Sequence, residues 1–191
     1  MKRNISQNMK SINKYIFFIS CLVLVFSCQK KKEDWKPVEG DLFTNWTLDV
    51  TPETVWQQYP RPQLERLEWK NLNGLWQYAI IPQNDEKPKK FQGKILVPFP
   101  VESALSGVKK KVGSDKKLWY KRTFTIPEKW DGKDIALHFE AVDWETEVWL
   151  NGESIGTHKG GYDHFKFIIK TKQLKTVNEL VVGVSDPTDT G

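Results

Sequence analysis

The acidic residues in the second half of the chain form two close pairs whose spacing suits acid–base chemistry. Asp143 and Glu145 flank Trp144, and Asp186 and Asp189 lie on either side of a Pro-Thr dipeptide. Two carboxyl groups held about 5 to 9.5 Å apart are the arrangement that cleaves glycosidic bonds. Aspartates beside turns also cap backbone N–H groups without any catalytic role. Turn capping is the simpler interpretation of both pairs, and a catalytic pair is the alternative.

A second group of polar and aromatic residues gathers in the loops of the same half. Aromatic faces stack on the C–H faces of sugars, aspartate and histidine bond to hydroxyl groups, and concave binding sites mix these types. The paired Gly160 and Gly161 allow the backbone to approach a ligand closely. The alternative is that Trp144 and Tyr162 close the end of the core. The predicted sugar-binding residues are Asp143, Trp144, His158, Tyr162, Asp163, Asp186 and Asp189.

Metal and cofactor sites have little support in the sequence. There is no phosphate-binding loop and no His-Glu-x-x-His motif. The three histidines, His138, His158 and His164, lack the spacing of metal ligands. We therefore expect ordinary polar histidines, no metal site and no cofactor.

The first 28 residues have the layout of an export signal. A polar, basic segment, residues 1–14, precedes the twelve-residue apolar run Tyr15–Phe26, and Ser27 and Cys28 follow. Such a run is too short for a bilayer-spanning helix, which needs roughly 20 residues, and it is typical of a signal peptide. The segment resembles a bacterial lipoprotein signal with residues 25–28 as its lipobox, which implies that Cys28 is lipidated. Cys21 is a weaker candidate; an uncleaved anchor or a buried helix is the alternative.

This resemblance divides the chain into three parts and places it at a membrane. Residues 1–27 are the predicted signal peptide, residues 28–41 a polar tether, and residues 42–191 the folded domain. The mature chain would be exported and anchored to a bacterial membrane, at its periplasmic or outer-membrane face, through a lipid on Cys28. Cleavage before Cys28 leaves no second cysteine, so no disulfide is expected.

The charge of the mature domain argues against a nucleic-acid partner. The formal net charge is +5, but residues 1–27 hold four basic residues and no acidic one. Beyond them 25 basic residues face 24 acidic ones, whereas a nucleic-acid surface needs a basic patch. The 9 Trp and 10 Phe of this 191-residue chain predict a packed core, and the length excludes a complete (β/α)₈ barrel of about 250 residues.

Short alternating segments indicate an all-β fold. They are separated by turn residues at intervals of about 10 residues, which is typical of a β-sandwich or jelly roll. A short helix is expected from Thr51, one helical turn within 171–177, and an exposed lysine-rich loop at 108–117, with a basic ligand patch as the alternative. The predicted strands are residues 75–81, 94–98, 118–126, 135–141, 147–151, 154–157, 165–169 and 180–185.

Five runs, in matching order and spacing, resemble the amino-terminal sugar-binding domain of glycoside hydrolase family 2, the β-galactosidase and β-glucuronidase family. They cover nearly everything from residue 42 onward. The runs are Tyr59–Ile80, Lys94–Val108, Leu118–Pro127, Leu137–Phe165 and Asn178–Gly191.

The resemblance implies a jelly-roll, galactose-binding-like β-sandwich that lacks its last strand or strands. It also implies that the catalytic glutamates belong to a barrel outside this chain, so the chain alone is expected to be inactive. Leu118-Trp119-Tyr120 stands where the β-galactosidases have a sugar-contacting Asn, which leaves the sugar open. A β-glycoside would be bound by the complete enzyme.

Three functions remain open at this point. The chain is expected to be the front piece of an exported family 2 glycosidase. The first alternative is a stand-alone carbohydrate-binding lipoprotein. The second is a structural or interaction β-sandwich with no sugar site.

Overall fold

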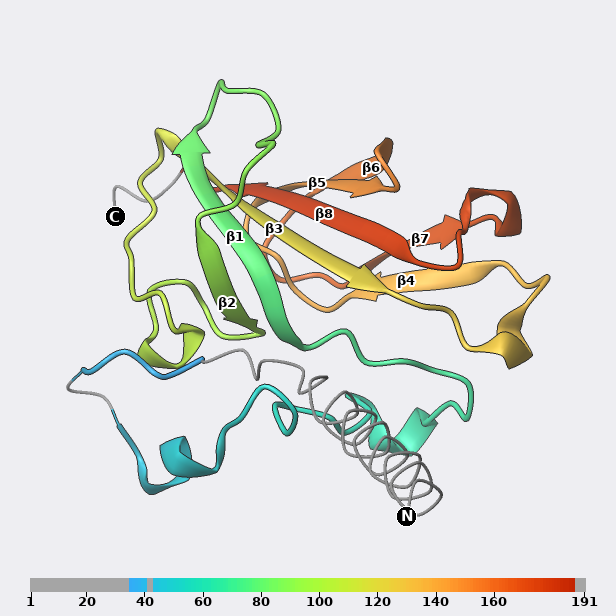
Figure 1. Ribbon diagram of the computed structural model, residues 1–191, viewed down its shortest axis with the longest axis horizontal. Coiled ribbons are helices and arrows are strands. Elements are labelled where there is room, and N and C mark those ends of the chain that lie inside the picture. Colours follow the sequence, from blue (N-terminus) through green and yellow to red (C-terminus); the bar gives the residue numbers. More distant parts are fainter. Residues whose placement is uncertain (1–34, 41–42, 188–191) are drawn as a thin grey trace, which may run out of the picture. The chain divides into compact units, whose positions relative to one another are not determined.

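The computed structural model describes residues 35–40 and 43–187 (Figure 1). The predicted signal peptide, Cys28 and Asp189 lie outside these residues. Regular structure in the described part consists of strands and short 3₁₀ turns, and none of its helices is long and apolar enough to cross a membrane. The predicted all-β fold is confirmed.

Eight antiparallel strands form two sheets. The larger sheet has six strands in the order β2-β1-β3-β8-β5-β6, and the smaller pairs β4 with β7. Figure 1 shows β8 lying between strands that are distant in sequence. The strands are β1 (Gly74–Pro82), β2 (Gly93–Val97), β3 (Lys116–Phe124), β4 (Ile135–Phe139), β5 (Glu145–Leu150), β6 (Glu153–Lys159), β7 (Phe165–Ile169) and β8 (Asn178–Ser185).

Five 3₁₀ turns connect or precede these strands, and each is three to five residues long. The last of them confirms the helical turn expected within 171–177. They are η1 (Asn45–Asp49), η2 (Pro62–Leu64), η3 (Ala104–Ser106), η4 (Glu128–Trp130) and η5 (Thr171–Gln173).

The main core lies between the two sheets. Alternate side chains of the large sheet, such as Val148 and Val182, pack with Leu137 and Ile169 of the small sheet, and all four are buried. Alternation follows from the strand period of two, which sends neighbouring side chains to opposite faces. The opposite face of the large sheet is not left bare, because Trp119 belongs to a second buried cluster there with Ala79 and Val181. The central strand β8 is therefore covered on both sides.

The hairpin predicted between residues 147 and 157 is confirmed. Asn151 and Gly152 connect β5 to β6 with φ angles of +53° and +94°. Positive φ at both central residues is the geometry of a type I′ turn, whose twist matches that of the flanking strands. Asn tolerates the first position and Gly the second, so the sequence predicts this turn from its chemistry.

Two local predictions are wrong. The expected helix at Thr51 is a single turn, in which the Val55 N–H donates to the Thr51 carbonyl at 3.0 Å. The turn ends at Trp56, whose φ of +42° is left-handed. The lysine-rich stretch 108–117 is not an exposed loop throughout, because Val108 is buried in the core and the last two lysines belong to β3.

Part of the predicted tether contacts the folded domain. The Trp35 indole N–H donates to the Ser106 carbonyl at 3.4 Å, and the Val38 N–H donates to the Ala104 carbonyl at 3.0 Å. The left-handed Gly107 lies against the same indole, so a side chain at that position would meet the ring. Residues 35–40 are thus fixed to the η3 turn.

Candidate functional site

Three segments converge at one end of the sandwich. Backbone hydrogen bonds join the β4–β5 connection to the β6–β7 connection and to the end of β8. Gly160 N–H donates to the Trp144 carbonyl at 3.0 Å, and Trp144 N–H donates to the Ser185 carbonyl at 3.4 Å. The structure therefore brings Asp143, Trp144 and the loop after β6 together, and Asp186 directly follows the Ser185 carbonyl that Trp144 contacts. We call Asp143, Trp144, Asp186 and residues 160–163 of the β6–β7 loop the loop-end cluster.

Asp143 lies directly on the backbone of the β6–β7 loop. Its carboxyl oxygen occupies the space that a side chain at Gly161 would need. A residue larger than glycine would therefore push Asp143 out of its position. The close approach of these two segments explains why a glycine is needed at position 161, and it fixes an acidic side chain at the edge of the cluster.

The Trp144 ring carries a cation on one side. Lys159 Nζ lies 5.3 Å from the ring centroid and 3.1 Å from Glu145 Oε1. Glu145 and Lys159 are also direct partners in the β5–β6 ladder. The indole is half-buried, so its exposed part offers an apolar surface beside polar groups.

The remaining predicted residues differ in accessibility. Tyr162 is 99% exposed, so it does not close the end of the core, and Asp163 beside it is exposed as well. His158 instead stacks on Phe165, with ring centroids 4.1 Å apart and an interplanar angle of 14°. Its Nε2 atom is buried and has no hydrogen-bond partner in the described part of the chain. Tyr162 and Asp163 are therefore accessible from solvent, whereas the His158 ring packs on Phe165.

Residues 152–156 match the Gly-x-Ser-x-Gly motif of a serine nucleophile, which was not considered in the sequence analysis above. A nucleophile of this kind sits on a sharp turn between a strand and a helix. Ser154 instead lies within β6, opposite Trp149 of β5, and its side chain is exposed. The hairpin geometry excludes the role that the motif suggests.

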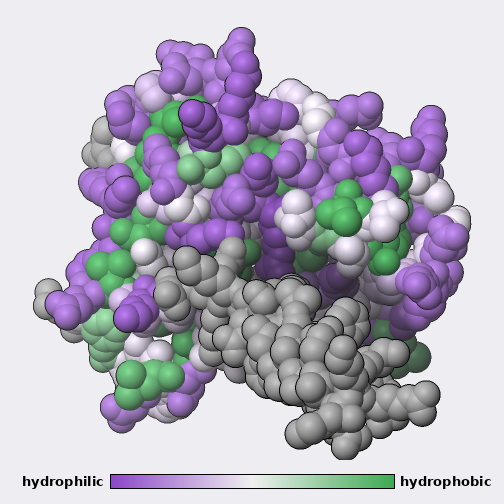
Figure 2. All heavy atoms as spheres, viewed as in Figure 1, coloured by the Kyte–Doolittle hydropathy of each residue, from purple (hydrophilic) through white to green (hydrophobic). Residues whose placement is uncertain are grey.

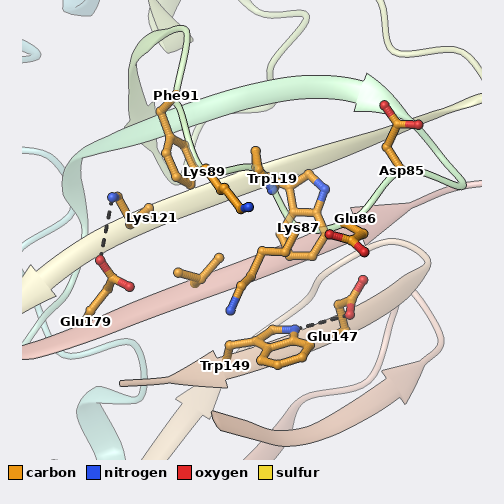
Figure 3. Close-up of a pocket in the computed structure, with 12 residues that line it drawn as sticks. Asp85, Glu86, Lys87, Lys89, Phe91, Trp119, Lys121, Glu147, Trp149 and Glu179 are labelled. Atoms are coloured by element: carbon orange, nitrogen blue, oxygen red, sulfur yellow. Dashed lines mark hydrogen bonds and ion pairs between the residues drawn. The ribbon is translucent and has the colours of Figure 1, made fainter. Parts of the chain in front are cut away.

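A second concave feature lies on the outer face of the large sheet, and sequence reasoning did not predict it. It is a hollow of about 730 Å³ between the β1–β2 loop and strands β3, β8 and β5 (Figure 3). Figure 2 shows hydrophilic side chains over the loop, at the top of the view. The lining residues are Asp85, Glu86, Lys87, Pro88, Lys89, Phe91, Trp119, Lys121, Glu147, Trp149, Glu179 and Val181.

Ion pairs and ring contacts organise the floor of this hollow. Glu147 accepts from Lys117 at 2.6 Å and from the Trp149 indole N–H at 3.2 Å. Lys121 lies 3.5 Å from the Glu179 carboxylate. In the described residues no group of three or more His, Cys, Asp or Glu side chains is arranged to hold a metal ion. The chemistry available here is stacking and hydrogen bonding.

Comparison with known proteins gives consistent matches. The family described as "Glycosyl hydrolases family 2, sugar binding domain" matches residues 94–189. A β-glucuronidase of Paenibacillus borealis is 28% identical over 114 residues, covering 56% of this chain and 19% of that protein. A β-galactosidase of Thermoanaerobacter pseudethanolicus is 43% identical over 60 residues, covering 31% of this chain and 8% of that protein.

Solved structures share the fold. A β-glucuronidase from Ruminococcus gnavus, in complex with D-glucuronic acid, superposes with a TM-score of 0.52 at 22% sequence identity. The match covers 68% of this chain and 24% of that one. This chain therefore spans a quarter or less of the length of the relatives it matches.

Proposed function

This chain belongs to glycosyl hydrolase family 2 through its sugar-binding domain, and on that premise we propose that it is part of an exported glycosidase. Its loop-end cluster contacts the β-linked sugar substrate of that enzyme. The observation that carries the proposal is the convergence of Asp143, Trp144 and the β6–β7 loop at one end of the sandwich. The relatives are named β-glucuronidases and β-galactosidases. Their shared chemistry is the hydrolysis of β-glycosides.

The loop-end cluster supplies recognition in this proposal. Tyr162 and the exposed part of Trp144 offer apolar ring surface to the C–H face of a sugar, and Asp143 and Asp163 accept hydrogen bonds from its hydroxyls. Hydrolysis with retention needs two carboxyl groups about 5 to 5.5 Å apart, one as nucleophile and one as acid and base. We assign neither role to this chain, and we expect it not to hydrolyse a glycoside by itself.

A titration tests the binding role. The full chain, purified in detergent, is titrated with methyl β-glucuronide and methyl β-galactoside while tryptophan fluorescence is followed. Saturable binding of at least one sugar is expected, with a loss of tenfold or more in Trp144→Ala and in Tyr162→Ala. Trp46→Ala is the matched control, since Trp46 is 74% exposed and belongs to η1. Unchanged affinity in both loop-end variants would refute the proposal.

The membrane anchor is a second part of the proposal, and the support for it is the lipoprotein-like segment that ends at Cys28. Cells expressing the full chain are labelled with an alkyne fatty acid, and the protein is recovered from the membrane fraction. The label is expected in the wild type and in Cys21→Ala, and it is expected to be lost in Cys28→Ala. Label retained in Cys28→Ala would contradict lipidation at this residue.

A further inference from the structure

The hollow on the outer face of the large sheet has the features of a second ligand site, separate from the loop-end cluster. We propose that it binds a neutral β-linked oligosaccharide, with Trp149 as the stacking platform and Lys87 as a side chain that the sugar displaces. Its volume of about 730 Å³ lies within the range of small-molecule sites. The proposal does not depend on sugar binding at the loop end.

The floor of the hollow is shaped by a missing side chain. Gly183 lies on the central strand β8, and a Cβ atom there would stand 2.9 Å from a Trp119 ring atom and 3.0 Å from Glu147 Cγ. Glycine inside a strand often marks a place where a ligand or another chain segment approaches closely. Here it lets Trp119 and Glu147 approach each other over β8.

The half-buried Trp149 ring lies under the ammonium group of a lysine from the β1–β2 loop. Lys87 Nζ lies 4.0 Å from the Trp149 ring centroid, and Figure 3 shows Lys87 reaching from the β1–β2 loop toward this ring. A cation over an aromatic face at a partly exposed site is weakly held. The edge of the same ring is fixed, since its N–H donates to Glu147 at 3.2 Å. A sugar ring that replaces the ammonium therefore meets an oriented platform.

Trp119 adds a hydrogen-bond donor that lacks an acceptor. Its side chain is 2% exposed, and its Nε1 atom has no partner in the described part of the chain. In Figure 3 this nitrogen faces the side of the hollow on which Asp85 lies. A buried donor without a partner is unfavourable, so this indole gains if ligand binding rearranges the lining and brings an acceptor to it.

The charges of the lining favour a neutral ligand. The lining has four acidic and three basic side chains, and Glu179 is paired with Lys121 at 3.5 Å. Glu147 is likewise held by Lys117 from the rim. The acidic and basic side chains of the lining nearly balance, and sugar hydroxyls can donate to and accept from the two ion pairs without breaking them.

Calorimetry on the full chain in detergent tests the proposal with three probes. These are β-1,4-galactotetraose, cellotetraose and a β-1,4-linked glucuronic acid tetrasaccharide. At least one neutral probe is expected to bind more tightly than the acidic one. Trp149→Ala is expected to weaken that binding tenfold or more, and Lys87→Ala to strengthen it twofold or more. The control Trp46→Ala is expected to change it less than twofold, and in Trp144→Ala the binding component that Trp149→Ala weakens is expected to remain.

The indole N–H signals in a nitrogen-15 spectrum give a readout that does not need a destabilising variant. Galactotetraose or cellotetraose is expected to shift the signals of Trp119 and Trp149 in the wild-type chain. The proposal is overturned if neither neutral probe binds, if the acidic probe binds best, or if the shifts and losses follow Trp144 instead. That last result would support sugar binding at the loop-end cluster and would exclude sugar binding in the hollow.

Discussion

Lys117 and Glu147 form an ion pair across a strand to which neither belongs. The two residues come from β3 and β5, which flank β8, and the Lys117 Nζ atom lies 2.6 Å from Glu147 Oε1. Their side chains are 19% and 25% exposed, so solvent screens the pair only partly. The contact is possible because Gly183 leaves the surface of β8 open between them.

We predict that Lys117→Met lowers the free energy of unfolding by about 1 to 3 kcal/mol, since it leaves a half-buried carboxylate without its cation. Glu147→Gln is expected to have an effect of similar size. Urea denaturation of the wild type, both single variants and the double variant gives the coupling energy. If the two single effects simply add in the double variant, the pair contributes nothing to stability.

A side chain at Gly183 is predicted to be tolerated poorly. Gly183→Ala would overlap the Trp119 ring and Glu147, and overpacking of this kind costs about 1 to 3 kcal/mol. Gly113→Ala is the matched control, because its Cβ would approach only the exposed Asp115 side chain, at 3.0 Å. Thermal unfolding of both variants measures the difference. Equal melting temperatures would show that the sheet adjusts around the added methyl group.

Arg122 anchors the chain where it enters β1. Its guanidinium donates to the carbonyls of Leu72 and Asn73, at 2.7 Å in each case. The Leu72 carbonyl also accepts from the Trp76 indole, so Asn73 is the group that depends most on Arg122. Arg122→Met is expected to cost about 2 kcal/mol, and Arg122→Lys less, because an ammonium can still donate one bond. A urea midpoint equal to that of the wild type would exclude this anchoring role.

The strands were predictable because their signals are local. Alternation of apolar and polar residues predicts the strand at 135–141, which the structure has at Ile135–Phe139, and turn chemistry at Asn151 and Gly152 predicts the hairpin. The cap signal at Thr51 was also read correctly, since Thr51 does accept bonds from the N–H groups that follow it. The expected helix stops after this one turn because Trp56 leaves the helical region, at a φ of +42°.

The hollow could not be predicted because it exists only through long-range pairing. Trp119, Glu147 and Glu179 follow one another at intervals of about 30 residues in sequence, and they meet because β8 inserts between β3 and β5. The residues around each of them do not predict the order of the strands in the sheet. The loop-end cluster was easier, because Asp143 and Trp144 lie in the same resembling run as the β6–β7 loop, although the buried stacking of His158 was not foreseen.

The last prediction concerns acid stability at the η5 turn. Asp134 accepts from Lys170 Nζ at 2.8 Å and from the Thr171 N–H at 3.1 Å. These two hydrogen bonds lower the pKa of Asp134 below its ordinary value of 3.8, and the bond from Lys170 has the larger effect. A carboxyl group with a lowered pKa in the folded state stabilises the protein above its unfolded pKa and loses that contribution as the pH falls through the folded pKa.

The wild type is therefore expected to lose more stability than Asp134→Asn when the pH is lowered from 5 to 2. The difference between their unfolding midpoints should shrink as the pH falls through the lowered pKa of Asp134. Because Asp134 is exposed, the difference at pH 5 should also shrink in 1 M salt, which screens the Lys170 attraction. Parallel pH profiles for the two proteins would show that the Asp134 bonds do not stabilise the fold.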